Sequence, residues 1–255
     1  MDLPINHFKR AIMAGEQQIG LWSSLASNVT TEVLAGAGFD WLLIDAEHAP
    51  NDVRSVLGQL QAMMEYRTQP IVRVPMNDKI EIKRYIDIGV QSFLIPMVET
   101  ADEARAAVEA TRFAPDGMRG FAGVSRASRF GRIADYHRRA HEEICILVQV
   151  ESELGIENIE AIAAVPGVDG VFIGPGDLSA AMGHLGNQGH ADVVDLIEKA
   201  IRRIVAAGNR PGILTGDETL ARKYMAAGCL FTAVGLDTGI LARGAEALAR
   251  KYKGA

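Results

Sequence analysis

A repeated order of helix, glycine and strand is the strongest constraint on how this chain can fold. A helical pattern ends at a glycine, a few residues follow, and a short apolar run rich in β-forming residues then leads into polar residues. Glycine can adopt the left-handed conformation that ends a helix and turns the chain toward a strand. The repeat is clearest around Gly38, Gly89, Gly167 and Gly228.

Eight apolar runs predict eight strands, with centres near residues 21, 43, 72, 94, 147, 172, 213 and 232. Continuous apolar runs are typical of parallel strands that are buried on both faces. The helices predicted between them are Val29–Ala37, Val53–Tyr66, Ile80–Ile88, Asp102–Thr111, Leu154–Ala164, Val193–Ala207, Glu218–Ala227 and Ile240–Tyr252. Thr100 and Glu103 have the spacing of a capping box before the fourth of these helices.

Eight alternations of strand and helix within 255 residues favour an α/β fold, a single (β/α)8 barrel (TIM barrel) domain over residues 1–255. A doubly wound open sheet is the alternative. Such a sheet normally carries a GxGxxG phosphate-binding turn after its first strand. The sequence at that place reads GLWSSLASN and contains no such turn.

The composition limits the partners and the compartment of the protein. Hydrophobic residues make up 48% of the chain and charged residues 23%, as in soluble globular proteins. A net charge of −6 gives no reason to expect nucleic acid or an anionic membrane as a partner. The charged N-terminus does not resemble a signal peptide, and no apolar run approaches the roughly 20 residues of a membrane span. Cys145 and Cys229 lie beside apolar runs, so we expect buried thiols in a reducing, cytoplasmic compartment.

One segment interrupts the repeat. Between Phe113 and Arg139 lies a long insertion that contains GMRGFAGVSRASRFGR. Its arginines are Arg119, Arg126, Arg129, Arg132, Arg138 and Arg139. Long loops inside compact domains are usually functional or disordered. We expect this arginine-rich insertion to be a lid or an interface segment.

Ionisable residues gather at the ends of the predicted strands, where barrels of this kind carry their sites. The residues that follow the second, third, fifth and sixth runs include Asp45, Glu47, His48, Arg73, Glu151 and Asp177. A single acid in such a place is more often a helix cap or a turn residue, and a lone arginine is often half of a structural ion pair. A complementary set is hard to explain in that way, so we predict that they converge on one site.

These residue types fit one chemistry. Glu151 and Asp177, with waters and a bidentate oxo acid, would form an all-oxygen site that suits Mg²⁺, Mn²⁺ or Co²⁺. Such a metal polarises a 2-oxo acid so that an enolate can form. Arg73 could stabilise the enolate oxygen, and His48 could move a proton near neutral pH. A glycine-rich turn could hold the substrate carboxylate through its backbone N–H groups; its residues are Gly174, Pro175 and Gly176.

The lysines argue against an enamine mechanism. A Schiff-base aldolase needs a partly desolvated lysine inside the barrel. None of the lysines in this chain ends an apolar run, and all fall in polar, helix-like or terminal stretches. We therefore expect no covalent amine catalysis.

Four segments, in this order, resemble a known family: GFDWLLIDAEHAPND, PIVRVP, LVQVES and GVFIGPGDLSAAMG. They are similar to the metal-dependent (class II) pyruvate aldolases, the family of 4-hydroxy-2-oxoheptanedioate aldolase and 2-dehydro-3-deoxyglucarate aldolase. The similarity extends from Gly20 to the final helix. The resemblance implies reversible cleavage of a 4-hydroxy-2-oxo acid to pyruvate and an aldehyde through a metal-bound enolate, with a role in aromatic compound catabolism.

The resemblance also implies roles for particular residues. Glu151 and Asp177 would bind the metal, and Arg73 would contact the pyruvate oxygen. His48 and Asp45 would transfer a proton through a water. An aspartate that matches Asp87 is associated with the catalytic histidine in the family, although an exposed helix acid is the plain alternative. The residues expected to contact the substrate are Trp22, Arg73, Gly174, Pro175, Gly176 and Leu214.

The family further implies a homohexamer whose C-terminal helix packs on, or is exchanged with, a neighbouring subunit. Two segments depart from the family pattern, GFAGVSRASRF in the insertion and ILTGDE after the seventh strand. Both are expected near the aldehyde, so the aldehyde stays open. The alternatives are a 2-keto-3-deoxy sugar acid or hydroxypyruvate as substrate, a related acyl-CoA lyase, and a catalytically silent barrel used for assembly or ligand binding.

Overall fold

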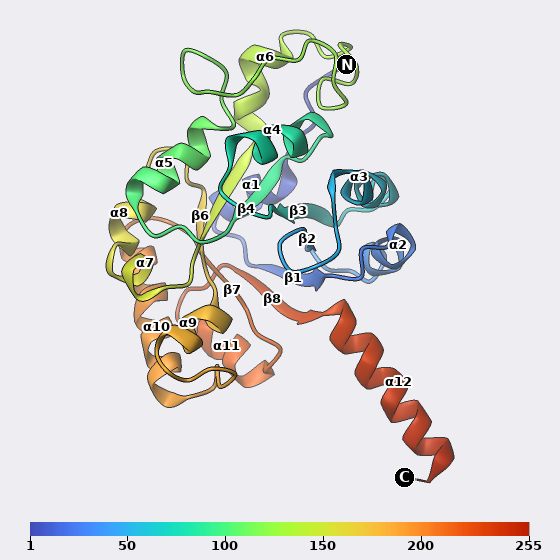
Figure 1. Ribbon diagram of the computed structural model, residues 1–255, viewed down its shortest axis with the longest axis vertical. Helices are drawn as coiled ribbons and strands as arrows, with labels where there is room; N and C mark the ends of the chain where they lie inside the picture. The colour runs from blue at the N-terminus through green and yellow to red at the C-terminus, as the bar shows by residue number, and fades with distance from the viewer. Residues whose placement is uncertain (255) are drawn as a thin grey trace.

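Eight parallel strands form a closed barrel in the computed structural model, which describes residues 1–254 (Figure 1). Each strand pairs with the next one along the chain, and the last closes against the first. The strands are β1 (Gln18–Ser23), β2 (Trp41–Asp45), β3 (Gln69–Arg73), β4 (Ser92–Ile95), β5 (Cys145–Val150), β6 (Gly170–Ile173), β7 (Pro211–Leu214) and β8 (Phe231–Leu236). The predicted (β/α)8 barrel is confirmed, and the open sheet is excluded.

Seven helices lie where the sequence predicts them. They are α2 (Asn28–Ala35), α3 (Val53–Ala62), α4 (Lys79–Asp87), α5 (Ala101–Glu109), α10 (Ala191–Ala206), α11 (Glu218–Ala226) and α12 (Asp237–Lys253). Polar N-cap side chains accept hydrogen bonds from the first turns of α2 to α5 and of α11, which explains where these helices begin. The capping box formed by Thr100 and Glu103 is confirmed.

The predicted helix Leu154–Ala164 is instead two helices, α7 (Glu153–Glu157) and α8 (Ile159–Ala163). They meet at Asn158, whose side-chain amide donates a 2.9 Å hydrogen bond to the carbonyl of Glu99. A contact with a distant segment therefore accompanies the break.

Four short helices are absent from the predicted set. They are α1 (His7–Met13), α6 (Tyr136–Arg139), the 3-10 helix η1 (Ala140–Glu143) and α9 (Pro175–Ala181). The expected free turn at Gly174–Gly176 is in fact the start of α9. Gly174 is its N-cap and Pro175 its first helical residue, a position that tolerates the missing N–H of proline.

Aromatic rings pack in the half of the barrel interior that is farther from the carboxyl ends of the strands. Phe8 of α1 lies under the strands and packs edge-on against Trp41 and Phe231, with ring centroids 6.0 and 5.8 Å away. A Cβ at Gly20 would lie 2.2 Å from the Trp41 ring, and one at Gly212 would lie 2.0 Å from the Phe231 ring. Glycine at these two positions therefore makes room for the large rings, and the interior is a packed core.

The arginine-rich insertion lies at the amino ends of the strands. It connects α5 to β5, and an α-to-β connection arrives where a strand begins. There Arg119 pairs with Asp87 of α4 at 3.3 Å, and Arg126 donates to the carbonyl of Ile88. The site predicted at the carboxyl ends is on the opposite side of the barrel. The expected lid over this chain's own site is therefore wrong, and the interface alternative stays a prediction.

Helix α12 points away from the barrel (Figure 1). Asp237, at its start, is its only buried residue among those described. The Asp237 carboxylate accepts hydrogen bonds from the backbone N–H groups of Ser24 and Leu25, at 2.9 and 3.1 Å. Beyond this anchor, apolar side chains such as Ile240 and Leu248 are exposed. No helix among residues 1–254 combines the length and apolar character needed to cross a bilayer.

Replacing Phe231 with alanine should strongly destabilise the barrel. The ring is buried between Phe8 and Trp41, so its loss leaves a cavity. We expect the free energy of unfolding to fall by about 3–5 kcal/mol, measured by urea denaturation. Phe130→Ala is the control, because that ring is 59% exposed. Equal losses of unfolding free energy in the two variants would contradict the assignment of Phe231 to the packed barrel core.

Candidate active site

A cavity of about 460 Å³ opens at the carboxyl ends of the strands. The predicted site residues that line it are Trp22, Asp45, His48, Arg73, Glu151, Gly174, Pro175, Gly176, Asp177 and Leu214. The structure therefore brings these residues together. Asp87 is the exception, because it ends α4 at the other side of the barrel and pairs there with Arg119.

The pleat of the strands explains why these side chains converge. Every second residue of a strand faces the same side. Along β2, Trp41 and Leu43 belong to the interior core and Asp45 follows them at the mouth. Along β5 and just beyond it, Gln149 and Glu151 reach the same cavity. The register that buries the lower side chains thus presents polar ones at the carboxyl end.

Arg73 and Asp45 form a buried ion pair at the centre of the mouth. Arg73 Nε lies 2.9 Å from Asp45 Oδ1, and Arg73 Nη2 lies 2.7 Å from Oδ2, so the pairing is bidentate. Trp22 Nε1 donates a further hydrogen bond to Asp45, and the guanidinium lies 5.0 Å from the Trp22 ring centroid. Burial acts to raise the pKa of Asp45, but the hydrogen bonds and charge of Arg73 outweigh it and lower that pKa.

Glu47 lies between Arg73 and His48. Its Oε2 is 2.9 Å from Arg73 Nη1 and 3.8 Å from His48 Nε2. Burial raises the pKa of Glu47 against the opposing charge of Arg73. Asp45 contacts His48 through the backbone, because its carboxylate accepts a hydrogen bond from the backbone N–H of His48. The carboxylate that lies beside the imidazole is that of Glu47. Glu47 follows the second strand in the sequence. The presence of a glutamate there does not reveal that its carboxylate lies between Arg73 and the His48 imidazole.

Glu151 is a buried carboxylate held by neutral donors. It is 4% exposed. Its Oε1 accepts from the backbone N–H of Met97 at 3.0 Å, and its Oε2 accepts from Gln149 Nε2 at 2.5 Å. Burial raises the pKa of Glu151, and the charges of Glu47 and Asp177 add to this effect. Met97 has a left-handed φ of 53°, so the chain accepts local strain where it contacts Glu151.

The donor set fits a divalent cation. Glu151 and Asp177 line one cavity, and neither hydrogen-bond donor to Glu151 is charged. A Cβ at position 174 would lie 2.5 Å from Glu151 Oε2, so glycine leaves this carboxylate free of a crowding side chain. An anionic site with only oxygen donors suits a hard metal ion such as Mg²⁺ or Mn²⁺.

Several residues of the cavity were not predicted. They are Ser24, Gln149, Phe172, Gln188, Leu236 and Thr238. Gln149 could have been found, because it lies two residues before Glu151 and shares its face. Ser24 and Gln188 come from loops, which carry no periodic signal. The described lining contains no lysine, which agrees with the argument against a Schiff base.

The fold and the site define a (β/α)8-barrel enzyme with a carboxylate-rich centre suited to a divalent metal. Residues 18–244 match the family model described as HpcH/HpaI aldolase/citrate lyase. This chain therefore belongs to the HpcH/HpaI aldolase family, and it is a carbon–carbon lyase, as the sequence resemblance implies.

Individual relatives cover nearly the whole chain. The hydroxypyruvate/pyruvate aldolase of Deinococcus radiodurans is 58% identical over 254 residues, which is 99% of this chain and 92% of the relative. The 4-hydroxy-2-oxo-heptane-1,7-dioate aldolase of Salmonella dublin is 55% identical over 248 residues, 97% of this chain and 94% of the relative. The crystal structure of an HpcH/HpaI family protein from Burkholderia cenocepacia J2315 has a TM-score of 0.93 at 42% identity, with 96% and 98% of the two chains covered.

Removing either carboxylate should abolish metal binding. For Glu151→Gln and Asp177→Asn we expect no measurable Mn²⁺ binding by calorimetry, because each change removes a charged oxygen ligand. Asp195→Asn on α10 is the control, since this acid is 62% exposed and carries the same charge. Circular dichroism should show that all three variants fold. Wild-type affinity in either site variant would rule out that residue as a ligand.

Proposed function

We propose that the protein is a divalent-metal-dependent pyruvate aldolase. It would cleave a 4-hydroxy-2-oxo acid, such as 4-hydroxy-2-oxoheptanedioate, between C3 and C4 to give pyruvate and an aldehyde. The observation that carries this proposal is the buried Glu151, which is held by neutral donors and lines the same cavity as Asp177 and Arg73. The names of the two relatives support the same reaction class.

The side chains divide the chemical work. Glu151 and Asp177 would hold a divalent cation, which would supply Lewis-acid polarisation of the 2-oxo group. As the C3–C4 bond breaks, its electron pair moves toward C3 and the C2 oxygen, and negative charge develops on that oxygen. The guanidinium of Arg73 provides a fixed positive charge for this oxygen, because Asp45 holds it from behind with two hydrogen bonds.

Proton transfer falls to His48 and its neighbour Glu47. Cleavage requires the C4 hydroxyl to lose a proton, and the C3 carbon of pyruvate to gain one. The His48 side chain is 68% exposed at the mouth, so it can exchange protons with water. The Oε2 atom of Glu47 lies 3.8 Å from His48 Nε2 and is placed to orient the imidazole.

The substrate carboxylate would lie at the start of α9. The first-turn N–H groups of a helix have no partner within the helix and carry a partial positive charge. Gly174, Pro175 and Gly176 line the cavity at this point, next to Asp177. Trp22 and Leu214 form apolar walls of the same cavity.

Hydroxypyruvate is a second candidate donor in place of pyruvate. The relative from Deinococcus radiodurans, at 58% identity, is named for both compounds. Hydroxypyruvate differs by one hydroxyl group on C3, and polar residues such as Ser24 and Gln188 line the cavity. The two donors can be compared directly by aldol addition to one aldehyde.

The activity should depend on a metal and on Arg73. With 4-hydroxy-2-oxoheptanedioate we expect pyruvate release that stops after complete chelation with EDTA and returns with Mg²⁺ or Mn²⁺. Arg73→Ala should lower kcat about 100-fold or more, because a donor to the developing oxyanion is lost. Arg138→Ala, an exposed arginine of the insertion, serves as the control. Pyruvate release that survives chelation would overturn the metal-dependent mechanism.

We also propose that α12 packs against a second copy of the chain within a homo-oligomer, a hexamer as the family resemblance implies. The helix covers little of its own barrel, and its exposed apolar side chains include Ile240, Leu241 and Leu248. An apolar groove beside β1, β8 and α11 offers a surface of matching character; it is lined by residues such as Ile19, Met225 and Val234. The helix of one copy could thus cover the groove of another.

Leu241→Glu should weaken this assembly. A charge on the apolar face of α12 would have to be buried in the contact, which is unfavourable. We expect the mass measured by sedimentation equilibrium to fall toward that of the 27.4 kDa chain. Lys253→Glu, at the last turn of the same helix, should leave the mass unchanged. An unaltered mass for Leu241→Glu would exclude this face from the interface.

The location proposed for the protein is the cytoplasm. Both cysteines are buried and unpaired, as the sequence predicts. Burial raises the pKa of the Cys229 thiol to about 12 and that of Cys145 well above its usual value. Such thiols stay protonated and unreactive, which suits a structural role in a reducing compartment.

A further inference from the structure

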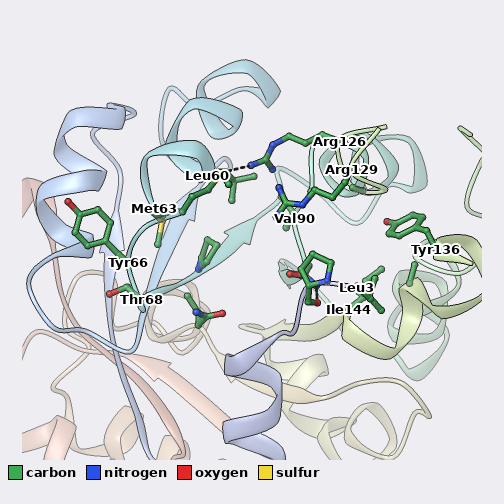
Figure 2. Close-up of a pocket in the computed structure, with 18 residues that line it drawn as sticks. Leu3, Leu60, Met63, Tyr66, Thr68, Val90, Arg126, Arg129, Tyr136 and Ile144 are labelled. Atoms are coloured by element: carbon green, nitrogen blue, oxygen red, sulfur yellow. Dashed lines mark hydrogen bonds between the residues drawn. The ribbon is translucent and has the colours of Figure 1, made fainter. Parts of the chain in front are cut away.

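A second cavity, of about 230 Å³, lies at the opposite end of the barrel from the candidate active site (Figure 2). Residues just before or at the beginning of three strands border it: Pro70 at β3, Val90 before β4 and Ile144 before β5. Its facing wall belongs to the arginine-rich insertion. The cavity therefore shares no residue with the catalytic mouth.

Two arginines of the insertion, Arg126 and Arg129, line this cavity together. Figure 2 shows them beside each other on one side of the cavity, facing the apolar side chains of α3. The described lining contains no aspartate or glutamate. The ion pairs of the insertion are made instead by Arg119 and Arg139. Two partly buried positive charges thus share one pocket without a counter-charge.

The chain holds the first guanidinium in place. Arg126 Nη1 donates a 2.5 Å hydrogen bond to the carbonyl of Ile88. A Cβ at Gly89 would lie 2.6 Å from this Nη1, and Gly89 has a φ of +98°, so glycine makes the arrangement possible. Burial lowers the pKa of Arg126, and the charge of Arg129 adds to the effect. An anion in the pocket would relieve both.

The second guanidinium is placed by a strained turn. Arg129 and Phe130 have left-handed φ values of 52° and 57°. The backbone N–H of Arg129 donates to the carbonyl of Arg126, and Ser128 Oγ accepts from Gly131. Non-glycine residues in this conformation are uncommon and persist where their surroundings hold them, often at ligand sites. The turn keeps Arg126 and Arg129 on one side of the cavity.

Apolar side chains make up much of the remaining lining, together with the polar Thr68, Gln69 and Gln91. Its walls include Leu60, Met63, Val90 and Ile144, and Tyr136 lines another side of the cavity, away from the two guanidinium groups (Figure 2). A guanidinium binds a planar carboxylate through two parallel hydrogen bonds, and the apolar walls favour an organic body. We propose that this pocket binds an organic carboxylate with an apolar, ring-sized body, whose carboxylate lies between Arg126 and Arg129.

This binding site is independent of the proposed catalytic function. It lies at the amino ends of the strands, whereas substrates enter at the carboxyl ends. Its ligand is therefore not the substrate of the catalytic mouth. Failure of either proposal leaves the other standing, since each is tested with different residues and different compounds.

The test uses phenylacetate as the probe, with full-length protein in EDTA so that no metal takes part. We expect calorimetry to give a dissociation constant of about 1 mM or lower, in the range of a fragment-sized ligand. Arg126→Gln and Arg129→Gln should each weaken binding at least about tenfold, since each loses a charged hydrogen-bond pair. Arg129→Lys should also weaken it, because lysine keeps the charge but lacks the bidentate geometry.

Two control variants and two control compounds make the result specific. Arg138→Gln changes the same charge in the same insertion outside the cavity, and should bind phenylacetate as the wild type does. Arg73→Gln should also bind normally, whereas weakened binding there would place the probe in the catalytic mouth. Phenylacetamide and inorganic phosphate should bind more weakly than phenylacetate. Absence of binding, equal binding by Arg129→Gln, or equal binding of either control compound would overturn the proposal.

Discussion

Closure of eight parallel strands into one barrel forces every second side chain of each strand into a shared interior. The interior is too narrow to hold water along its length, so its lower positions carry Trp41, Phe231 and other large apolar groups. At the carboxyl ends of the strands, the inward-facing positions lie beyond the packed core. Asp45, Arg73 and Glu151 occupy these positions, and the mouth of the barrel is polar for that reason.

The bidentate pair of Arg73 and Asp45 sets the electrostatics of this mouth. Asp45 pairs with the arginine and keeps its guanidinium in one orientation. The remaining carboxylates, Glu47, Glu151 and Asp177, then leave the mouth with an excess of negative charge. Burial raises the pKa of Glu47 and of Glu151, so the negative charge of these carboxylates is unfavourable in the folded protein. A bound cation would reduce this unfavourable energy.

Sequence periodicity was sufficient to predict the barrel and most of the rim. Eight apolar runs predict eight strands, and residues at the ends of parallel strands must share one edge, so Glu151 and Asp177 could be paired without coordinates. The order of the elements was also sufficient to place the arginine-rich insertion at the amino ends, because it follows a helix and precedes a strand. The expectation of a lid rested on the length of the insertion, and length does not indicate which end of the barrel a connection faces.

Other features depend on contacts that no local pattern records. The break at Asn158 accompanies a hydrogen bond to Glu99, far away in the sequence. The neighbour of the His48 imidazole depends on side-chain orientation: Asp45 turns toward Arg73, and Glu47 remains beside the ring. Loop residues such as Gln188 reach the cavity through the path of a connection, which has no period to detect.

Helix α12 is joined to the barrel through Asp237, which binds the backbone of Ser24. Ser24, Leu236 and Thr238 also line the candidate active-site cavity. The 17 residues of α12 make an arm about 25 Å long. A force on the free end of this arm would therefore act on the wall of the candidate active-site cavity. The proposed contact between subunits and the proposed substrate site would be connected through Asp237.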